Sequence, residues 1–442
     1  MTDLETLRTM GSRAFVWGYP IVRSAQVRMN LTHPRNLADQ NANAVAGAQI
    51  NTLGHARMLA TPATRVGVAP NNDTLYSLAW LDLSAGPFIL QAPEFGDRYY
   101  TFQMGQADSS TERSFGQRTH GSRLPPLFIY GPGSLVEVPA DMEPVQSRYR
   151  YLLVAGRILV DGTADLSAVH KLQDEIRLLR WGERTAILPA SEGGPGEPEV
   201  KADAPQKGCA LAFLQQLGSV LADIGTRPED DTVIASLSRI GLAPAKGLKF
   251  DHLDAGQRSA IAAGLRDGET LVRAKTHELG RKVNGWSINY RGASFGNDHL
   301  LRAAVALDQI YIVEADEALY PNARVDSDGD VLDGRHRYRI RFPPGALPPV
   351  GAFWSITLYF SKGFMVPNPI DRWSIGDRTP NLAFEDDGSL EILVQQAQPE
   401  QGNGNWLPAP AEPFMLLMRL YCPLARARDG QWVPPPVAKI ES

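Results

Sequence analysis

The chain has 442 residues, of which 43% are hydrophobic and 21% charged, and its 44 basic and 49 acidic side chains give a net charge of −5. This length predicts two or three domains, and the charge balance argues against nucleic acid or an anionic membrane as a partner. No apolar run reaches the roughly 18 residues that a membrane helix needs, and the first 15 residues do not have the pattern of a signal peptide. Cys209 and Cys422 form no CxxC motif, so we expect reduced thiols and a cytoplasmic protein.

The first half of the chain changes from a helical to a strand-like pattern. Residues 3–30 are predicted to form a helix, because apolar side chains recur at steps of three and four residues. Residues 65–160 instead hold short runs rich in aromatic and β-branched residues, separated by Gly, Pro and Asp, which is typical of an antiparallel β-domain. These runs include FILQA, RYYTFQM, LFIYGPG and RYRYLLVAGRILV.

A helical region follows. In residues 165–182, DLSAVHKLQDEIRLLRWG, the apolar side chains share one face and Asp165 is a plausible N-cap. Residues 186–208 are rich in Pro, Gly and charge, which predicts a long exposed loop. Further helical patterns cover 209–225, 228–240 and 253–282. From about residue 335 strand-like runs return, among them RYRIRFP, FWSITLYF, LEILVQQ and FMLLMRLYCP.

The predicted fold is therefore mainly β with a helical insertion (α+β), built on two antiparallel β-sandwich or jelly-roll-like domains. Because each predicted helix is apolar on one side only, the insertion should pack beside the β-domains rather than fold alone. Aromatic-rich strand edges make a homo-oligomer the expected state. The predicted parts are a helical lead-in (1–64), a first β-domain (65–163), the helical insertion (164–289) and a C-terminal β-domain (290–442).

Several separated motifs carry a family resemblance. PNNDTLYS (70–77), the following Trp80-Leu81-Asp82, RYYTFQ (98–103), GxRxxG (116–121) and GPG (131–133) together resemble the domain-of-unknown-function family 1254. The later runs VDSDGDVLDGRHRYRIRFPPGALPPVGAFWSITLYF and NGNWLPAPAEPFMLLMRLYCP resemble the partner family 1214. The resemblance covers roughly residues 40–160 and 290–440. It implies two β-sandwich or barrel-like domains with a helical part, and it implies little about activity.

The densest polar cluster of the first β-domain is Asn71, Asn72 and Asp73, directly before a predicted strand. A turn that caps the strand explains such residues, because Asn and Asp bond readily to local backbone. The alternative is a pocket that Asp73 and one Asn face, with Asp73 as an acid or base, while strand alternation places Thr74 and Tyr76 on one face and Leu75 on the other.

Three further residues are candidates for binding or proton transfer. In GQRTHG, an extended backbone would place Arg118 and His120 on one side, where Arg suits an oxyanion and His a proton. The third is His55, which precedes the polar cluster by about fifteen residues, although a lone His is more often a core group. We expect Asp73 and Arg118 to line one pocket, because a buried carboxylate needs a partner.

Two other motifs are expected to form a helix cap and a turn. Asn297 or Asp298 would cap a helix, and Arg302 on that helix could reach toward a domain junction. The run DSDGDVLDG (326–334) departs from the calcium loop of EF-hands, because Gly329 precedes the third Asp and Arg337 stands at position twelve, so we expect a hairpin turn.

The sequence has no GxSxG, HExxH, GxGxxG or Walker motif, and its histidines lack metal-ligand spacing, so neither a metal nor a cofactor is expected. The leading hypothesis is a cofactor-independent lyase or hydrolase that moves protons on a small oxygenated substrate. The alternatives are a carbohydrate- or small-molecule-binding protein, and a metal-dependent oxygenase. The catalytic candidates are Asp73, His55, His120 and Arg118. The substrate-binding candidates are Asn71, Asn72, Tyr76, Tyr100, Gln103, Arg302, Trp354 and Tyr359.

Overall fold

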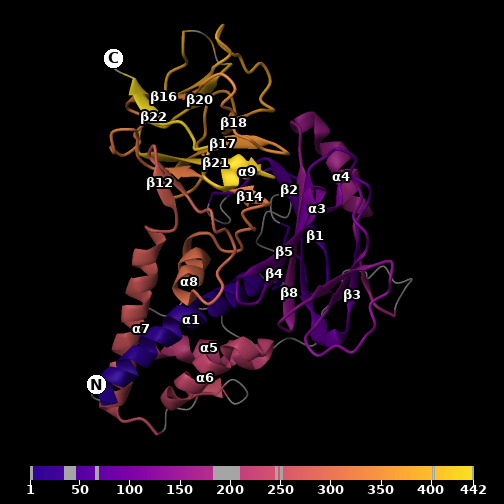
Figure 1. Cartoon of the computed structure of the whole chain (residues 1–442), viewed down its shortest axis with the longest axis vertical. Coiled ribbons are helices and arrows are strands. Elements are labelled where there is room, and N and C mark those ends of the chain that lie inside the picture. The colour runs from indigo at the N-terminus through magenta and orange to yellow at the C-terminus, as the bar shows by residue number, and fades with distance from the viewer. Residues whose placement is uncertain are drawn as a thin grey trace.

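The fold is described from a computed structural model, which covers residues 3–33, 46–64, 69–182, 210–243, 247–248, 252–400, 402 and 404–440. The predicted loop 186–208 and Cys209 lie outside the described residues. Figure 1 shows three parts: a first β-domain in magenta, a C-terminal β-domain in orange and yellow, and a group of helices beside them.

The first β-domain is a sandwich of two sheets. One sheet has the strand order β1-β2-β8-β4-β5 and the other the order β7-β6-β3-β9. Leu75, Leu127 and Val154 are among the buried residues that fill the space between the sheets. All pairs are antiparallel except β6 with β7. The strands are β1 (Gly54–His55), β2 (Thr74–Asp82), β3 (Phe88–Gln91), β4 (Tyr100–Gln106), β5 (Thr111–Gly116), β6 (Leu127–Tyr130), β7 (Glu143–Gln146), β8 (Tyr151–Leu159) and β9 (Arg177–Arg180).

The C-terminal β-domain is a second sandwich. Its larger sheet has the order β12-β13-β15-β21-β17-β18, with β14 also paired to β21, and its smaller sheet has the order β20-β19-β16-β22. Ile340, Ile356 and Leu416 belong to the core between them. The strands are β12 (Arg281–Val283), β13 (Trp286–Ile288), β14 (Ala318–Leu319), β15 (Asn322–Ala323), β16 (Arg337–Phe342), β17 (Trp354–Phe360), β18 (Ser374–Gly376), β19 (Leu390–Gln395), β20 (Trp406–Pro408), β21 (Phe414–Tyr421) and β22 (Val437–Ile440).

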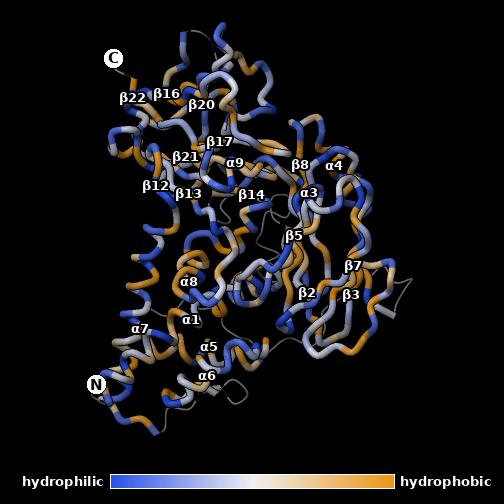
Figure 2. Tube along the Cα trace, viewed as in Figure 1, coloured by the Kyte–Doolittle hydropathy of each residue, from blue (hydrophilic) through white to orange (hydrophobic). Residues whose placement is uncertain are grey.

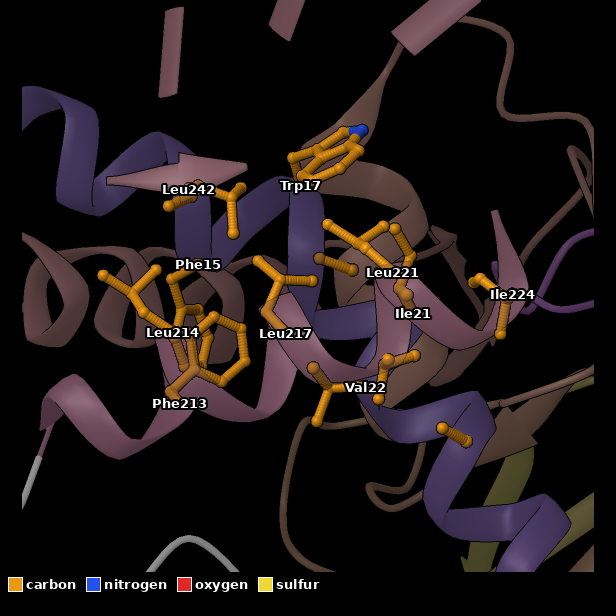
Figure 3. Packing of buried hydrophobic residues seen from close by; sticks show 14 of the residues in the cluster. Phe15, Trp17, Ile21, Val22, Phe213, Leu214, Leu217, Leu221, Ile224 and Leu242 are labelled. Carbon is orange, nitrogen blue, oxygen red and sulfur yellow. The ribbon is translucent and has the colours of Figure 1, made fainter. Parts of the chain in front are cut away.

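The helices come from separate stretches of the chain and pack together. Helix α1 lies along α7. The two helices can approach closely because Gly264 has no side chain; a Cβ at this position would collide with the carbonyl oxygen of Arg8. Figure 3 shows α1 and α5 sharing an apolar core that includes Trp17, Ile21 and Leu217. The larger helices are α1 (Asp3–Thr32), α4 (Leu166–Glu175), α5 (Ala210–Ile224), α6 (Asp231–Leu237), α7 (Ala255–Thr276) and α8 (His299–Asp308); α3 (Gln117–His120), α9 (Ala425–Arg428) and the short pair β10 (Leu242–Ala243) and β11 (Gly247–Leu248) complete the fold.

The predicted fold class is confirmed: the protein is mainly β with helical parts and has two sandwiches. Figure 2 shows apolar residues spread along the strands and helices that pack on each other. None of the helices in the described part of the chain has the length and apolarity that crossing a bilayer requires.

The predicted helix over 165–182 is wrong in its second half. Helix α4 ends at Glu175, and Arg177–Arg180 form strand β9, which pairs with β3. Pairing with β3 outweighs the helical spacing of the apolar residues in this segment. The edge of the smaller sheet offers backbone hydrogen bonds that an exposed helical turn would not. Asp165 stands at the N-cap position without capping, since its carboxylate binds Arg98 instead.

A buried ion network joins the helices to the first β-domain. Asp108, in the β4–β5 turn, is fully buried and accepts a hydrogen bond from Arg302 of α8 at 2.7 Å, and it lies 3.2 Å from Arg227. Arg227 also pairs with Asp230, which accepts from the indole of Trp17 on α1. Burial would raise the pKa of Asp108, but the charges of Arg302 and Arg227 lower it to about 2. Arg302 therefore links α8 to the β4–β5 turn, and its predicted contact with a substrate stays a prediction.

We expect Asp108→Asn to destabilise the protein by about 3–5 kcal/mol in urea unfolding, because Arg302 would remain buried without its counter-charge. The folded-state pKa of Asp108 is depressed, so its contribution is present above about pH 4 and is lost as the pH falls toward 2. The difference between wild type and variant should therefore shrink over that range. Glu269→Gln, which removes an exposed pair with Arg273, is the control and should change stability little. A difference that is constant from pH 7 to pH 2 would contradict this account.

Candidate functional site

The cluster at Asn71, Asn72 and Asp73 is the joint between the two β-domains. The Oδ1 atom of Asn71 accepts from the backbone N–H of Asp73 at 2.6 Å, which forms the predicted turn. Its Nδ2 group reaches across to the C-terminal domain and donates to the hydroxyl of Tyr421 at 2.7 Å. Asn72 donates to Ser374 at 3.3 Å. The turn itself uses only the side chain of Asn71. Asn71 and Asn72 also bind side chains of the C-terminal domain, which explains why the cluster holds more polar residues than a turn needs.

Asp73 is the strongest part of the joint. Its side chain is 3% exposed, and it accepts from Ser355 at 2.7 Å on one carboxylate oxygen and from Arg378 at 3.0 Å on the other. Arg378 also donates to the carbonyl of Val160 at 2.8 Å. Because both oxygens of Asp73 are engaged by the C-terminal domain, this carboxylate is held in place and is poorly suited to move a proton.

The joint brings the polar faces of two sheets together. Alternation in β17 sends Trp354, Ile356 and Leu358 into the C-terminal core, so Ser355, Thr357 and Tyr359 face the first domain. In the same way, β21 presents Arg419 and Tyr421 on that side. Strands β2, β4 and β8 present Tyr76, Gln103 and Arg157 from the first domain.

Arg157 lies in the middle of this face. It sits directly opposite Tyr76 in the β2–β8 register, and its Nε–H donates to the Tyr76 hydroxyl at 3.3 Å. Its Nη2 group donates to Gln103 at 2.8 Å, while Gln103 donates to the carbonyl of Tyr311 and is fixed by it. The Nη1 group of Arg157 is buried and has no partner among the residues that the structure describes.

Arg419 approaches from the C-terminal domain. It donates to the hydroxyls of Thr357 at 2.8 Å and Tyr359 at 2.9 Å, and to the carbonyl of Ala69 at 2.9 Å. Tyr359 in turn donates to the carbonyl of Pro70 at 2.7 Å. All of these partners are neutral. Within the described part of the chain, neither Arg157 nor Arg419 forms an ion pair.

The tyrosines around the two arginines differ in acidity. Burial would raise the pKa of Tyr76, but the charge and hydrogen bond of Arg157 and the charge of Arg419 lower it. Burial instead raises the pKa of Tyr320 to about 12, and it also raises the pKa values of Tyr359 and Tyr421. We call Tyr76, Arg157, Tyr320, Tyr359, Arg419 and Tyr421 the arginine–tyrosine cluster.

Asp73 and Arg118 each pair with another residue, Asp73 with Arg378 and Arg118 with Glu317, and their sharing of one pocket stays a prediction. Arg118 donates to the buried carboxylate of Glu317 at 2.9 Å, and Glu317 also accepts from Tyr99 at 2.8 Å. The segment around Arg118 is the helical turn α3 and not an extended strand, so the alternation that would align Arg118 with His120 does not apply. Asp73 and Arg118 each pair with a residue that is distant in the sequence. The spacing of motifs along the chain could not predict these pairs.

Several other candidates lie outside the arginine–tyrosine cluster. His55 contacts the buried Ser77 at 2.8 Å, on the opposite side of β2 from Tyr76, and burial lowers its pKa to about 4. His120 contacts the neighbouring Thr119 on α3 at 2.8 Å. Tyr100 stacks on Phe95 in the first core, and Trp354 lies in the second core. These aromatic side chains fill sandwich interiors, as most aromatic residues of β-domains do.

Two smaller predictions concern turns and caps. Asp298 caps α8 by accepting from the backbone N–H of Leu301 at 2.9 Å. In DSDGDVLDG, Asp326 accepts from the backbone N–H groups of Asp328 and Asp330, and Val325 pairs with Val331, so the segment is a turn. Among the described residues no three His, Cys, Asp or Glu side chains are grouped so that they could hold a metal ion.

Sequence reasoning identified Tyr76, Gln103, Tyr359, Asn71 and Asn72 but missed both central arginines. A signal was present, because each arginine interrupts an apolar strand: YLLVAGRILV contains Arg157 and FMLLMRLY contains Arg419. A charged side chain in a buried strand needs a polar partner or a ligand, whichever face it occupies.

Comparison with known proteins finds two matching domain families and one solved structure with a similar fold. Residues 50–180 match the family described as "Protein of unknown function (DUF1254)", and residues 317–425 match "Protein of unknown function (DUF1214)". The crystal structure of the VPA0106 protein from Vibrio parahaemolyticus is similar over 98% of this chain and 100% of that one, with a TM-score of 0.73 and 21% identity. An uncharacterised protein from Burkholderia cenocepacia matches over 99% and 96%, with a TM-score of 0.44 and 11% identity. No curated protein matches the chain.

The joint can be tested by a double-mutant cycle on Asp73→Asn and Arg378→Gln. Each change should cost about 2–3 kcal/mol in urea unfolding, somewhat below a fully buried pair because Arg378 is 23% exposed. Their combination should cost at least about 1 kcal/mol less than the sum, since both break one interaction. Asp73→Asn combined with Arg118→Gln is the control pair and should be close to additive. Additivity of the Asp73 and Arg378 variants would rule out the joint as described.

Proposed function

We propose that this chain, which belongs to the proteins that combine domains of unknown function 1254 and 1214, is an acid–base enzyme that acts on a small oxygenated organic molecule. The substrate would bind between the two β-domains, at the arginine–tyrosine cluster. The family names assign no activity, so the proposal is drawn from the geometry of this cluster.

One observation carries the proposal: the phenol of Tyr76 is hydrogen-bonded to Arg157, and neither Arg157 nor the nearby Arg419 forms an ion pair with a carboxylate in the described residues. Tyr76 keeps part of its surface exposed, and its hydroxyl bonds to Arg157. Arg419, on the opposite sheet, adds a second positive charge and lowers the pKa of the same phenol. A proton-transfer group with a pKa shifted toward neutral, beside fixed cations, is the usual arrangement of an acid–base site.

The two kinds of residue would have separate tasks. Tyr76 as phenolate would remove a proton from the substrate or from water, and as phenol it would return one. Arg157 and Arg419 would stabilise the negative charge that develops on a substrate oxygen. Lyase-type elimination and hydrolysis both need this pair of functions, so both reaction classes fit the cluster. Asp73, the leading candidate by sequence, takes the role of a domain joint instead.

Compartment and assembly remain predictions. Cys422 forms no disulfide with any residue that the structure describes, and burial raises its pKa to about 12, so its thiol is protonated at neutral pH. This fits the cytoplasmic location proposed from the cysteine content. A small-molecule substrate is the proposed partner, and a homo-oligomer is the proposed assembly.

Tyr76→Phe should abolish turnover while the protein stays folded, because it removes only the hydroxyl that moves the proton. Wild type and variant would each be incubated with a small-molecule extract of the source cells, and mass spectrometry would identify compounds that only the wild type consumes. Tyr130→Phe, on β6 and outside the cluster, is the matched control and should behave as wild type. If wild type and Tyr76→Phe leave the extract in the same state, the proposal of an acid–base site at Tyr76 fails.

The acidity of Tyr76 gives an independent test. Because its pKa is lowered, one tyrosine should ionise below the usual value of about 10 in an absorbance titration, and this step should be missing from Tyr76→Phe. Where the phenolate is the base, kcat/KM should rise with pH up to that ionisation and then level off. A titration that is identical in wild type and Tyr76→Phe below pH 10 would contradict the assignment.

A further inference from the structure

The charge balance of the arginine–tyrosine cluster restricts what can bind there. Arg157 is 9% exposed and Arg419 is 3% exposed, yet their described partners are hydroxyls, a carbonyl and an amide. The nearby carboxylates are already used, since Asp73 pairs with Arg378 and Glu317 with Arg118. Asp73 attracts Arg419, but among the described residues no carboxylate is in direct contact with either arginine. Burying two such charges is costly, and an anionic ligand would offset that cost.

The surroundings of the arginines favour a carboxylate over a phosphate or a sulfate. Phosphate sites commonly use backbone N–H groups at helix N-termini or in loops. Arg157 and Arg419 instead lie within strands β8 and β21. Arg157 is paired with both β2 and β4, and Arg419 is paired with β17. The donors available are guanidinium forks and phenols, and the planar fork of arginine fits a planar carboxylate.

An apolar wall continues from Arg419. Leu417 lies two residues before Arg419 in β21 and therefore on the same face, and it is partly exposed. Trp373 is also partly exposed, and both pack on a small buried cluster that contains Tyr359, Met365 and Met415. Tyr359 connects the two halves, because its hydroxyl accepts from Arg419 while its ring belongs to the apolar cluster.

We infer that the site takes a small monocarboxylate with an apolar portion. Its carboxylate would lie against Arg157 and Arg419, and its apolar portion against Leu417 and Trp373. This inference names the substrate class of the acid–base site and so rests on the proposed function. A single negative charge is sufficient, because the carboxylate would be shared by the two arginines while Tyr76 supplies the group that moves the proton.

The test is a titration calorimetry series with straight-chain monocarboxylates from acetate to octanoate, and with the matching alcohols, sulfate and phosphate as competing probes. Wild type should bind the carboxylates, with affinity that rises with chain length over the first members. Arg157→Gln should weaken binding at least about tenfold, because it removes a charge-assisted contact. Arg339→Gln, which alters only a surface pair with Glu391, is the control and should bind as wild type. Circular dichroism would confirm that each variant is folded.

A second variant keeps the test decisive if Arg157→Gln does not fold. Leu417→Ala leaves both arginines in place, so it should retain acetate binding and lose the gain with chain length. The inference is overturned if no monocarboxylate binds wild type, if folded Arg157→Gln binds as tightly as wild type, or if sulfate or phosphate binds as tightly as the longest acid.

The same series separates this inference from the proposed function. Tyr76→Phe should still bind the carboxylates, because Tyr76 is assigned to proton transfer and not to charge recognition. Carboxylate binding without any turnover that depends on Tyr76 would support the ligand class and refute the enzyme. Turnover that depends on Tyr76 without carboxylate binding would support the enzyme and refute the ligand class.

Discussion

The position of Asp73 between Ser355 and Arg378 is the constraint on which the site depends. One carboxylate, anchored in the first sandwich, takes a hydrogen bond on each oxygen from the second. The neighbouring Asn71 adds a bond to Tyr421 in the same direction. These bonds hold the polar faces of two sheets against each other, and that juxtaposition lets the charge of Arg419 act on Tyr76, which is hydrogen-bonded to Arg157.

Each strand at this interface serves two purposes through its alternation. In β17, one face supplies apolar residues to the sandwich core and the other supplies Ser355, Thr357 and Tyr359 to the interface. Strand β8 divides in the same way, with Val154 in the core and Arg157 outside it. Each sandwich is therefore stabilised by its own core, and the interface is free to carry polar groups. The helices complete the arrangement, because Asp108 locks α8 to the β4–β5 turn through Arg302.

The sequence predicts those features that depend on local pattern. Apolar spacing located α1 and α5 closely, and short β-branched runs identified both sandwiches. The cap at Asp298 and the turn at Asp326 followed from side chains that bond their own backbone. The segment after Glu175 was predicted wrongly because its strand depends on a partner, β3, that lies far away in the chain.

The site shows the same division between local and distant information. Tyr76, Gln103 and Tyr359 could be selected because each stands near a recognisable motif. The partners of Asp73 and Arg118 could not, since Arg378 and Glu317 are about 300 and 200 residues away, respectively. Arg157 and Arg419 stand in apolar runs without a motif, and nothing local shows that their two strands face each other.

The distribution of charge gives the remaining reason to regard the arginine–tyrosine cluster as functional. Arg378 and Arg118 each have a carboxylate oxygen within 3.0 Å. Between these pairs, Arg157 and Arg419 have only neutral partners among the described residues. A fold that needed rigidity alone would be served equally well by apolar residues of similar size, which avoid the cost of burying a charge. Buried arginines without a carboxylate in direct contact are expected where a ligand supplies the counter-charge. Functional sites commonly keep such residues although they lower the stability of the fold.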